Sequence, residues 1–78
     1  MPLLTQIRKL LAAAKKRKKK VAALHSLALI HAVAIKEVGP VEFCRAVGLP
    51  ATYHIEVRKM IAAAEFLPEL GYTLVSIR

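Results

Sequence analysis

Residues 21–38 form the most apolar stretch of the chain, and this stretch limits the folds that are open to it. The segment is rich in alanine and leucine, and its length is typical of a helix. Apolar side chains occur almost all round this predicted helix, which indicates a buried position. Gly39 and Pro40 end it, because glycine suits the position after a helix and proline cannot continue one. The rest of the chain is therefore expected to pack around one apolar core helix.

The remaining segments are shorter and mostly helical. Apolar residues recur with a helical period in three of them: residues 3–14, residues 41–47 and residues 51–66. Residues 48–50, Gly-Leu-Pro, are a turn signal between the last two. Residues 72–77 alternate and include β-branched and aromatic side chains, which predicts a strand. The predicted fold is mainly α, a small helical bundle with a short C-terminal β-strand, in a single domain over residues 1–78.

The chain has more apolar side chains than a domain of its size can easily bury. Its hydrophobic fraction is 56%, against about 45–50% in soluble domains generally. A domain of this length buries only about 60–65% of its unfolded surface. We therefore expect a partner to cover part of the apolar surface, most simply a second copy of the chain in a homodimer.

The positive charge is confined to one end of the chain. Residues 1–20 contain eight basic residues and no acidic one, whereas residues 21–78 contain five of each, so the net charge of +8 lies entirely in the first segment. A neutral body with a cationic end indicates a polyanionic partner, either nucleic acid or an anionic membrane.

Six of these cations are consecutive, at residues 15–20. They contain no glycine or proline, which predicts that the helix of residues 3–14 continues through them without a break or nearly so, although repulsion between like charges leaves a loop as the alternative. Such a block gives strong, salt-sensitive and sequence-independent affinity for phosphates, although a solvated charge run is the simpler interpretation. The predicted phosphate-binding residues are Arg8, Lys9, Lys15, Lys16, Arg17, Lys18, Lys19 and Lys20.

Residues 41–66 contain a short helix, a tight turn and a second helix. A small residue, Cys44, lies inside the first helix, Gly48 lies at the turn, and the apolar Leu49 follows directly. A further apolar residue, Val57, lies in the second helix. This pattern resembles the helix-turn-helix of DNA-binding proteins. One position departs from the pattern, because His54 stands where an apolar residue is expected and Ile55 comes one step late.

The resemblance implies that the second helix enters the major groove of DNA through its N-terminal part. The residues expected to face DNA are Thr52, His54, Arg58 and Lys59. Arg58 would make a bidentate contact with guanine, and Glu56 would either read a cytosine amino group or pair with Lys59. An ordinary helical hairpin without a DNA-binding role is the alternative interpretation of the same residues.

Other classes of function find little support. The chain has no aspartate, its glutamates are scattered, and its three glycines stand apart, so we expect no enzyme, cofactor or small-molecule substrate. His25 and His31 are six residues apart, whereas zinc-binding helices use a spacing of four, so we expect no metal site. The apolar run from residue 21 to residue 35 is shorter than the ~20 residues of a membrane span and lacks the polar face of an interfacial helix.

These observations predict a small basic DNA-binding protein of the transcriptional-regulator or nucleoid-associated type, located in the cytoplasm. A single cysteine leaves no intrachain disulfide, and no secretory signal is evident. RNA is a possible partner, although the chain offers few aromatic platforms for stacking bases. The alternative function is a non-enzymatic protein–protein interaction module, of the kind found in small phage or plasmid proteins, that uses its apolar excess as the binding surface.

Overall fold

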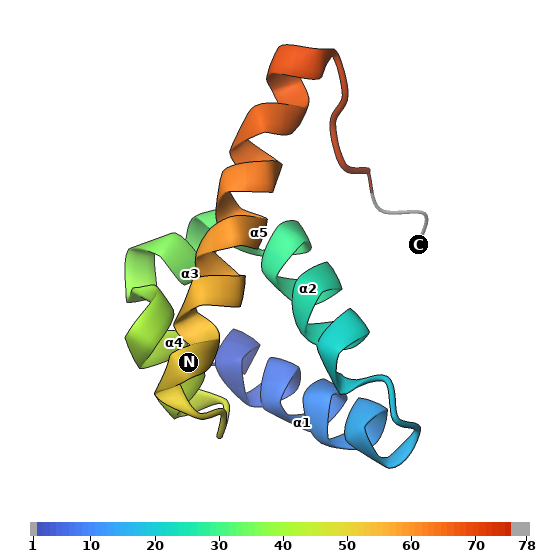
Figure 1. Ribbon diagram of the computed structural model, residues 1–78, viewed down its shortest axis with the longest axis vertical. Helices are drawn as coiled ribbons and strands as arrows, with labels where there is room; N and C mark the ends of the chain where they lie inside the picture. Colours follow the sequence, from blue (N-terminus) through green and yellow to red (C-terminus); the bar gives the residue numbers. More distant parts are fainter. Residues whose placement is uncertain (1, 76–78) are drawn as a thin grey trace.

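The structure, a computed structural model, describes residues 2–75 and is mainly helical, as predicted (Figure 1). Its elements in chain order are α1 (Pro2–Lys16), α2 (Lys20–Ile30), α3 (Ala32–Val38), α4 (Pro40–Ala46), the 3₁₀ turn η1 (Ala51–Tyr53), α5 (His54–Phe66) and the 3₁₀ turn η2 (Leu67–Leu70). Helix α5 packs against α2, α3 and α4, and α1 lies across the base of the bundle against α2 and α4. The C-terminal end of α5 and η2 extend to the opposite end of the molecule from α1.

One hydrophobic core joins all five α-helices. Its largest fully buried side chains come from each of them: Ile7, Leu24, Ile35, Phe43, Cys44 and Val57. Leu11 and Ile61 complete the inner faces of α1 and α5. No polar or charged residue among those described is fully buried. The core therefore depends on apolar packing, and the amphipathic spacing in residues 3–14 and 51–66 is explained by it.

The apolar stretch of residues 21–38 is helical, but the prediction of one helix is wrong. It bends by 90° at His31, between α2 and α3. His31 has φ −106° and ψ 27°, outside the α-helical region, while its carbonyl still accepts a hydrogen bond from the amide of Ile35. The bend directs Leu24 and Ala28 of α2 and Ile35 of α3 into the same core. A straight apolar helix would extend beyond so small a core, so packing favours the bent form.

Helices α2 and α3 are also the elements to weigh as a possible membrane span. In the part of the chain that the structure describes, no single helix is both long enough and apolar enough to cross a bilayer. Helices α2 and α3 reach that length and composition only together, as the bent pair.

The predicted continuation of the first helix through residues 15–20 is also wrong. Helix α1 ends at Lys16, and residues 17–19 form a turn in which Lys18 has the left-handed φ of 58°. The amide of Lys19 donates to the carbonyl of Ala14 at 2.8 Å, and that of Lys18 to Lys15 at 3.0 Å. This is the Schellman pattern, in which glycine usually occupies the left-handed position. The turn separates cations that a continuous helix would stack on one another at three- and four-residue spacing.

Lys18→Gly is therefore expected to stabilise the protein by about 0.5–1 kcal/mol, because a left-handed conformation is strained for any side chain with a Cβ atom. Urea denaturation followed by circular dichroism measures the change. Lys16→Gly is the matched control, since it removes the same charge but places glycine inside the last turn of α1, where it should destabilise by a similar amount. Equal effects of the two variants would contradict the prediction.

The predicted C-terminal strand is absent from residues 72–75, and its last residues, 76 and 77, lie outside the described part of the chain. Gly71 ends η2 with a left-handed φ of 86°, and the amide of Tyr72 donates to the carbonyl of Leu67 at 3.0 Å. The chain then turns back along the bundle (Figure 1). No described segment is extended beside residues 72–75, and an isolated strand has no partner for its backbone hydrogen bonds.

Candidate nucleic-acid interface

Helix α4, the following turn and α5 form a helix-turn-helix unit. Gly48 lies at the turn with φ 79°, and the amide of Leu49 donates to the carbonyl of Cys44 at 2.8 Å, which closes α4. Cys44, Leu49 and Val57 are all buried at the positions where the resemblance expected small or apolar side chains. Burial also raises the pKa of the Cys44 thiol, so this cysteine acts as a small apolar residue in the core. The predicted helix-turn-helix pattern is confirmed.

The departure from the pattern at His54 and Ile55 is explained by where the second helix begins. Residues Ala51–Tyr53 form the 3₁₀ turn η1, and α5 begins only at His54. His54 is half-buried, whereas Ile55 is 52% exposed, so neither is a core residue. Half-buried Tyr53 packs against the core instead. The ring of Tyr53 therefore packs where the pattern expected an apolar side chain at His54 or Ile55.

The four residues predicted to face DNA lie together on η1 and the first part of α5. Thr52, Arg58 and Lys59 are exposed, and His54 is half-buried. The Nε of Arg58 donates to Nδ1 of His54 at 3.1 Å, one helical turn away. This bond holds the guanidinium along the helix surface and leaves its terminal nitrogens available as donors.

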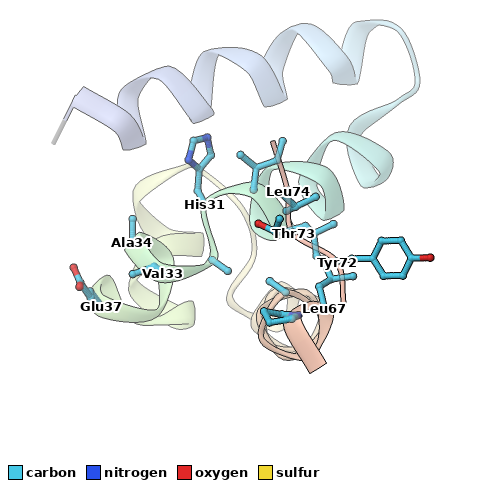
Figure 2. Close-up of a pocket in the computed structure, with 13 residues that line it drawn as sticks. His31, Val33, Ala34, Glu37, Leu67, Tyr72, Thr73 and Leu74 are labelled. Atoms are coloured by element: carbon cyan, nitrogen blue, oxygen red, sulfur yellow. The ribbon is translucent and has the colours of Figure 1, made fainter. Parts of the chain in front are cut away.

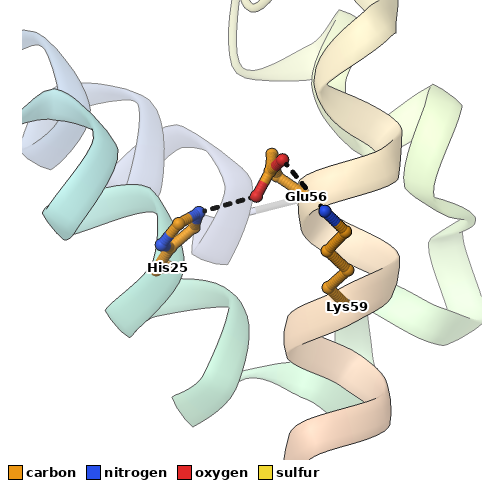
Figure 3. A network of polar contacts seen from close by, with 3 residues as sticks. All are labelled: His25, Glu56 and Lys59. Atoms are coloured by element: carbon orange, nitrogen blue, oxygen red, sulfur yellow. Dashed lines mark hydrogen bonds and ion pairs between the residues drawn. The ribbon is translucent and has the colours of Figure 1, made fainter.

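Glu56 is engaged within the protein (Figure 3). Its Oε2 lies 3.1 Å from Nε2 of His25 on α2, and its Oε1 lies 3.6 Å from Nζ of Lys59 on α5. The structure therefore shows the pairing with Lys59, one of the two roles expected for Glu56. The contact with His25 links two helices whose residues are 31 positions apart. No local pattern predicts it, because only the packing of α2 on α5 brings the two side chains together.

The basic segment meets the helix-turn-helix unit at two points. Nη1 of Arg8 donates to the carbonyl of Ala46 at 3.3 Å, at the end of α4. Its guanidinium also lies against Gly48, where an added Cβ atom would be 3.4 Å from Nη2. Glycine at this position is favoured by the left-handed turn, whereas an added Cβ atom would make only an ordinary van der Waals contact with Arg8. Nζ of Lys20 lies 5.0 Å from the ring centroid of Tyr53, a cation–π distance.

The other cations of the segment remain in solvent. Lys9 is exposed in the middle of α1, and the residues from Lys15 to Lys19 are exposed at its end and on the turn that follows. Among the described residues, no salt bridge links a cation of residues 8–20 to a carboxylate, whereas Lys36, Arg45 and Lys59 elsewhere all have acidic partners. The positive potential of this end is therefore not compensated within the described chain.

The comparisons with known proteins give one match. A family model described as an HTH-like domain matches residues 2–69, which run from α1 to η2. No curated protein and no solved structure matches the chain. The match is much longer than the α4–α5 unit, so the basic helix α1 and the bent pair α2–α3 lie within the same domain as the helix-turn-helix.

Proposed function

The chain belongs to the family of HTH-like domains, and from this premise we propose that it is a non-enzymatic protein that binds double-stranded DNA. One observation carries the proposal: two of the uncompensated cations of residues 8–20 contact the helix-turn-helix unit, Arg8 at the end of α4 and Lys20 at η1, directly before the second helix. Affinity for a phosphate backbone and a groove-reading helix thus occur on one surface. A transcriptional regulator or a nucleoid-associated protein of the cytoplasm fits this combination.

The two parts of this surface have different roles in the proposal. The basic segment contacts phosphates and positions the protein, without selecting a sequence. The start of α5 enters the major groove, where Thr52, His54, Arg58 and Lys59 face the bases, with Arg58 directed at guanine. Because the carboxylate of Glu56 already contacts His25 and Lys59, it is not free to contact a base. Arg58 is therefore the main candidate for a direct contact with the bases.

Retardation of duplex DNA over a salt series tests the proposal. We expect binding at low salt that weakens steeply as the salt concentration rises, because each phosphate contact releases a counterion. Absence of binding at low salt, or binding that does not respond to salt, would overturn the proposal. Competition with structured RNA of equal length shows whether duplex DNA is preferred. We expect that preference, because few aromatic side chains near the basic residues are available to stack with RNA bases.

We also propose that the protein is a homodimer, and the observation that favours this is an apolar groove between α3 and the C-terminal half of α5. The groove has a volume of about 610 Å³, and its rim includes Val33, which is 76% exposed. Three charged residues line it: Lys36 and Glu65, which are paired with each other at 2.6 Å, and Glu37. A mostly apolar face suits contact with an identical copy, because a twofold interface uses the same patch on both subunits and few charged groups are tolerated at its core.

A second pocket extends this face toward the C-terminal tail, residues 72–75 (Figure 2). It has a volume of about 480 Å³ and lies between the α2–α3 corner and Leu67, with Tyr72 and Leu74 beside it. Tyr72, Leu74 and Val75 are exposed apolar side chains of this tail. The region lies toward the end of α5, so a dimer formed here leaves the basic ends of both copies free to reach DNA.

Val33→Glu is accordingly expected to shift the protein from dimer to monomer while it remains folded, because it places two uncompensated charges in the interface. Sedimentation velocity measures the mass, and circular dichroism measures the helical content. Val21→Glu is the matched control, since Val21 is also an exposed valine, at 50%, but lies on α2 outside the groove. A Val33→Glu protein that sediments like the wild type would contradict the proposed interface.

The alternative function is an interaction module that binds another protein through the same apolar face, formed by α3 and the C-terminal half of α5. The favouring observation is the large exposed apolar area at the end of α5, where Phe66 and Leu70 are more than half exposed. Under this alternative, removal of the basic block leaves binding of the partner largely intact.

A further inference from the structure

A small pocket separates the end of α1 from the helix-turn-helix turn. It has a volume of about 220 Å³. Three cations line it, Arg8 and Lys15 from α1 and Lys20 from the start of α2. The opposite wall is formed by Val47, Gly48 and Leu49 of the turn, and no described carboxylate lines it. The sequence places these three cations over thirteen residues, and only the reversal of the chain at residues 17–19 brings them to one hollow.

Two of the three cations are held in place by the protein itself. Arg8 is bonded to the carbonyl of Ala46 at 3.3 Å and packs on Gly48. Lys20 is half-buried and lies over the ring of Tyr53. A long basic side chain normally loses rotamer freedom when it binds a ligand, and side chains that are already ordered lose less. The pocket is thus better prepared for a ligand than the exposed lysines of the same segment.

The charges in the pocket are also unbalanced. None of the three cations forms a salt bridge with a carboxylate of the described residues. Like charges around one hollow repel each other, and a bound anion relieves that repulsion. A phosphate group suits the site chemically, because the guanidinium and two ammonium groups supply donors around a compact oxyanion and the turn supplies an uncharged wall.

We propose that this pocket binds one phosphate group, that of the DNA backbone, and thereby fixes how α5 is presented to the groove. The inference rests on the proposed function and specifies it further. Arg8 contacts the turn that precedes α5, and Lys20 contacts η1 directly before it. A phosphate held by both cations is therefore placed at a fixed position relative to Thr52, His54 and Arg58. The lysines of residues 15–20 that lie outside the pocket then add affinity for DNA without fixing the orientation of the protein.

The test compares two double variants that remove the same charge. Lys15→Gln with Lys20→Gln alters the pocket, whereas Lys16→Gln with Lys19→Gln alters two exposed lysines of the same block outside it. At equal salt, we expect the pocket variant to lose at least about tenfold more affinity for duplex DNA than the outer variant, as for loss of one charge-assisted hydrogen bond. Lys15→Arg with Lys20→Arg is expected to retain wild-type affinity, which separates loss of charge from loss of fold.

Inorganic phosphate distinguishes the source of the ligand. In ¹⁵N-resolved NMR, short duplex DNA is expected to shift the amide resonances of Gly48 and Leu49 in the wild type and not in the pocket variant. Shifts with inorganic phosphate but none with duplex would overturn the DNA-backbone assignment and leave a site for free phosphate. Equal affinity losses in the two double variants would overturn the pocket while DNA binding itself stands. Absence of DNA binding by the wild type, in contrast, would overturn the proposed function.

Discussion

Replacing all six residues 15–20 with glutamine is expected to lower the affinity for duplex DNA by about three orders of magnitude at low salt, an effect of the size expected when most of the cations that bind phosphate groups are removed. The variant removes most of the uncompensated positive charge and brings the net charge from +8 to +2. The dependence of log affinity on log salt should become shallower by about one unit for each phosphate group that is no longer neutralised. Fluorescence anisotropy with a labelled duplex, measured at several salt concentrations, gives both quantities.

The control for this variant is Arg45→Gln, which removes a cation that already has an acidic partner, Glu42, and that does not line the apolar groove. Because that charge is compensated, the control variant should change affinity and salt dependence little. If DNA binding by the six-glutamine protein equals that of the wild type, the basic segment is only a solvated charge run. If the wild type does not bind DNA, and the six-glutamine variant still binds a protein partner through the apolar face, the interaction-module alternative is favoured.

Phe43→Ala is expected to destabilise the protein by about 3–5 kcal/mol, the usual loss for a fully buried phenylalanine. Phe43 is the largest fully buried side chain described, and it lies on α4 as part of the single core. Total stability of small domains is about 5–15 kcal/mol, and a 78-residue chain is expected near the lower end. The variant should therefore unfold at much lower urea concentration, if it folds cooperatively at all, and should lose DNA binding with its structure.

The same substitution at Phe66 provides the control. Phe66 lies at the end of α5 and is 52% exposed, so its truncation leaves no cavity in the core and should change the free energy of unfolding by less than about 1 kcal/mol. Urea titration at low protein concentration keeps self-association out of the comparison. Similar losses for both variants would contradict the assignment of Phe43 to the core and of Phe66 to the surface.

Features set by neighbouring residues could be predicted. The turn at Gly48 follows from a residue type that tolerates a left-handed φ, and the burial of Cys44, Leu49 and Val57 follows from the spacing of apolar residues around it. The end of the second segment at Gly39 and Pro40 is equally local. In each case the deciding interactions lie within a few positions along the chain, so the amino-acid types carry the information.

Three features required the packed molecule. The bend at His31 has no glycine or proline to mark it, and it exists because both halves of the apolar stretch meet one small core. The turn at Lys18 adopts a left-handed conformation that lysine itself disfavours. Residues 72–75 alternate like a strand, yet they have no extended neighbour among the described residues. In each case the conformation differs from the local preference of the residues, because it depends on how the segment packs in the whole molecule.

The candidate site divides in the same way. The sequence by itself determined that eight cations and no acid lie in the first twenty residues, and that a helix-turn-helix pattern follows at residues 41–66. Only the tertiary structure decided that Arg8 reaches Ala46, that Lys20 reaches Tyr53, and that Glu56 is held by His25. These partners are about thirty to forty positions apart, and charge or periodicity along the chain does not encode which of them meet. Their contacts arise from the packing of apolar faces on one shared core.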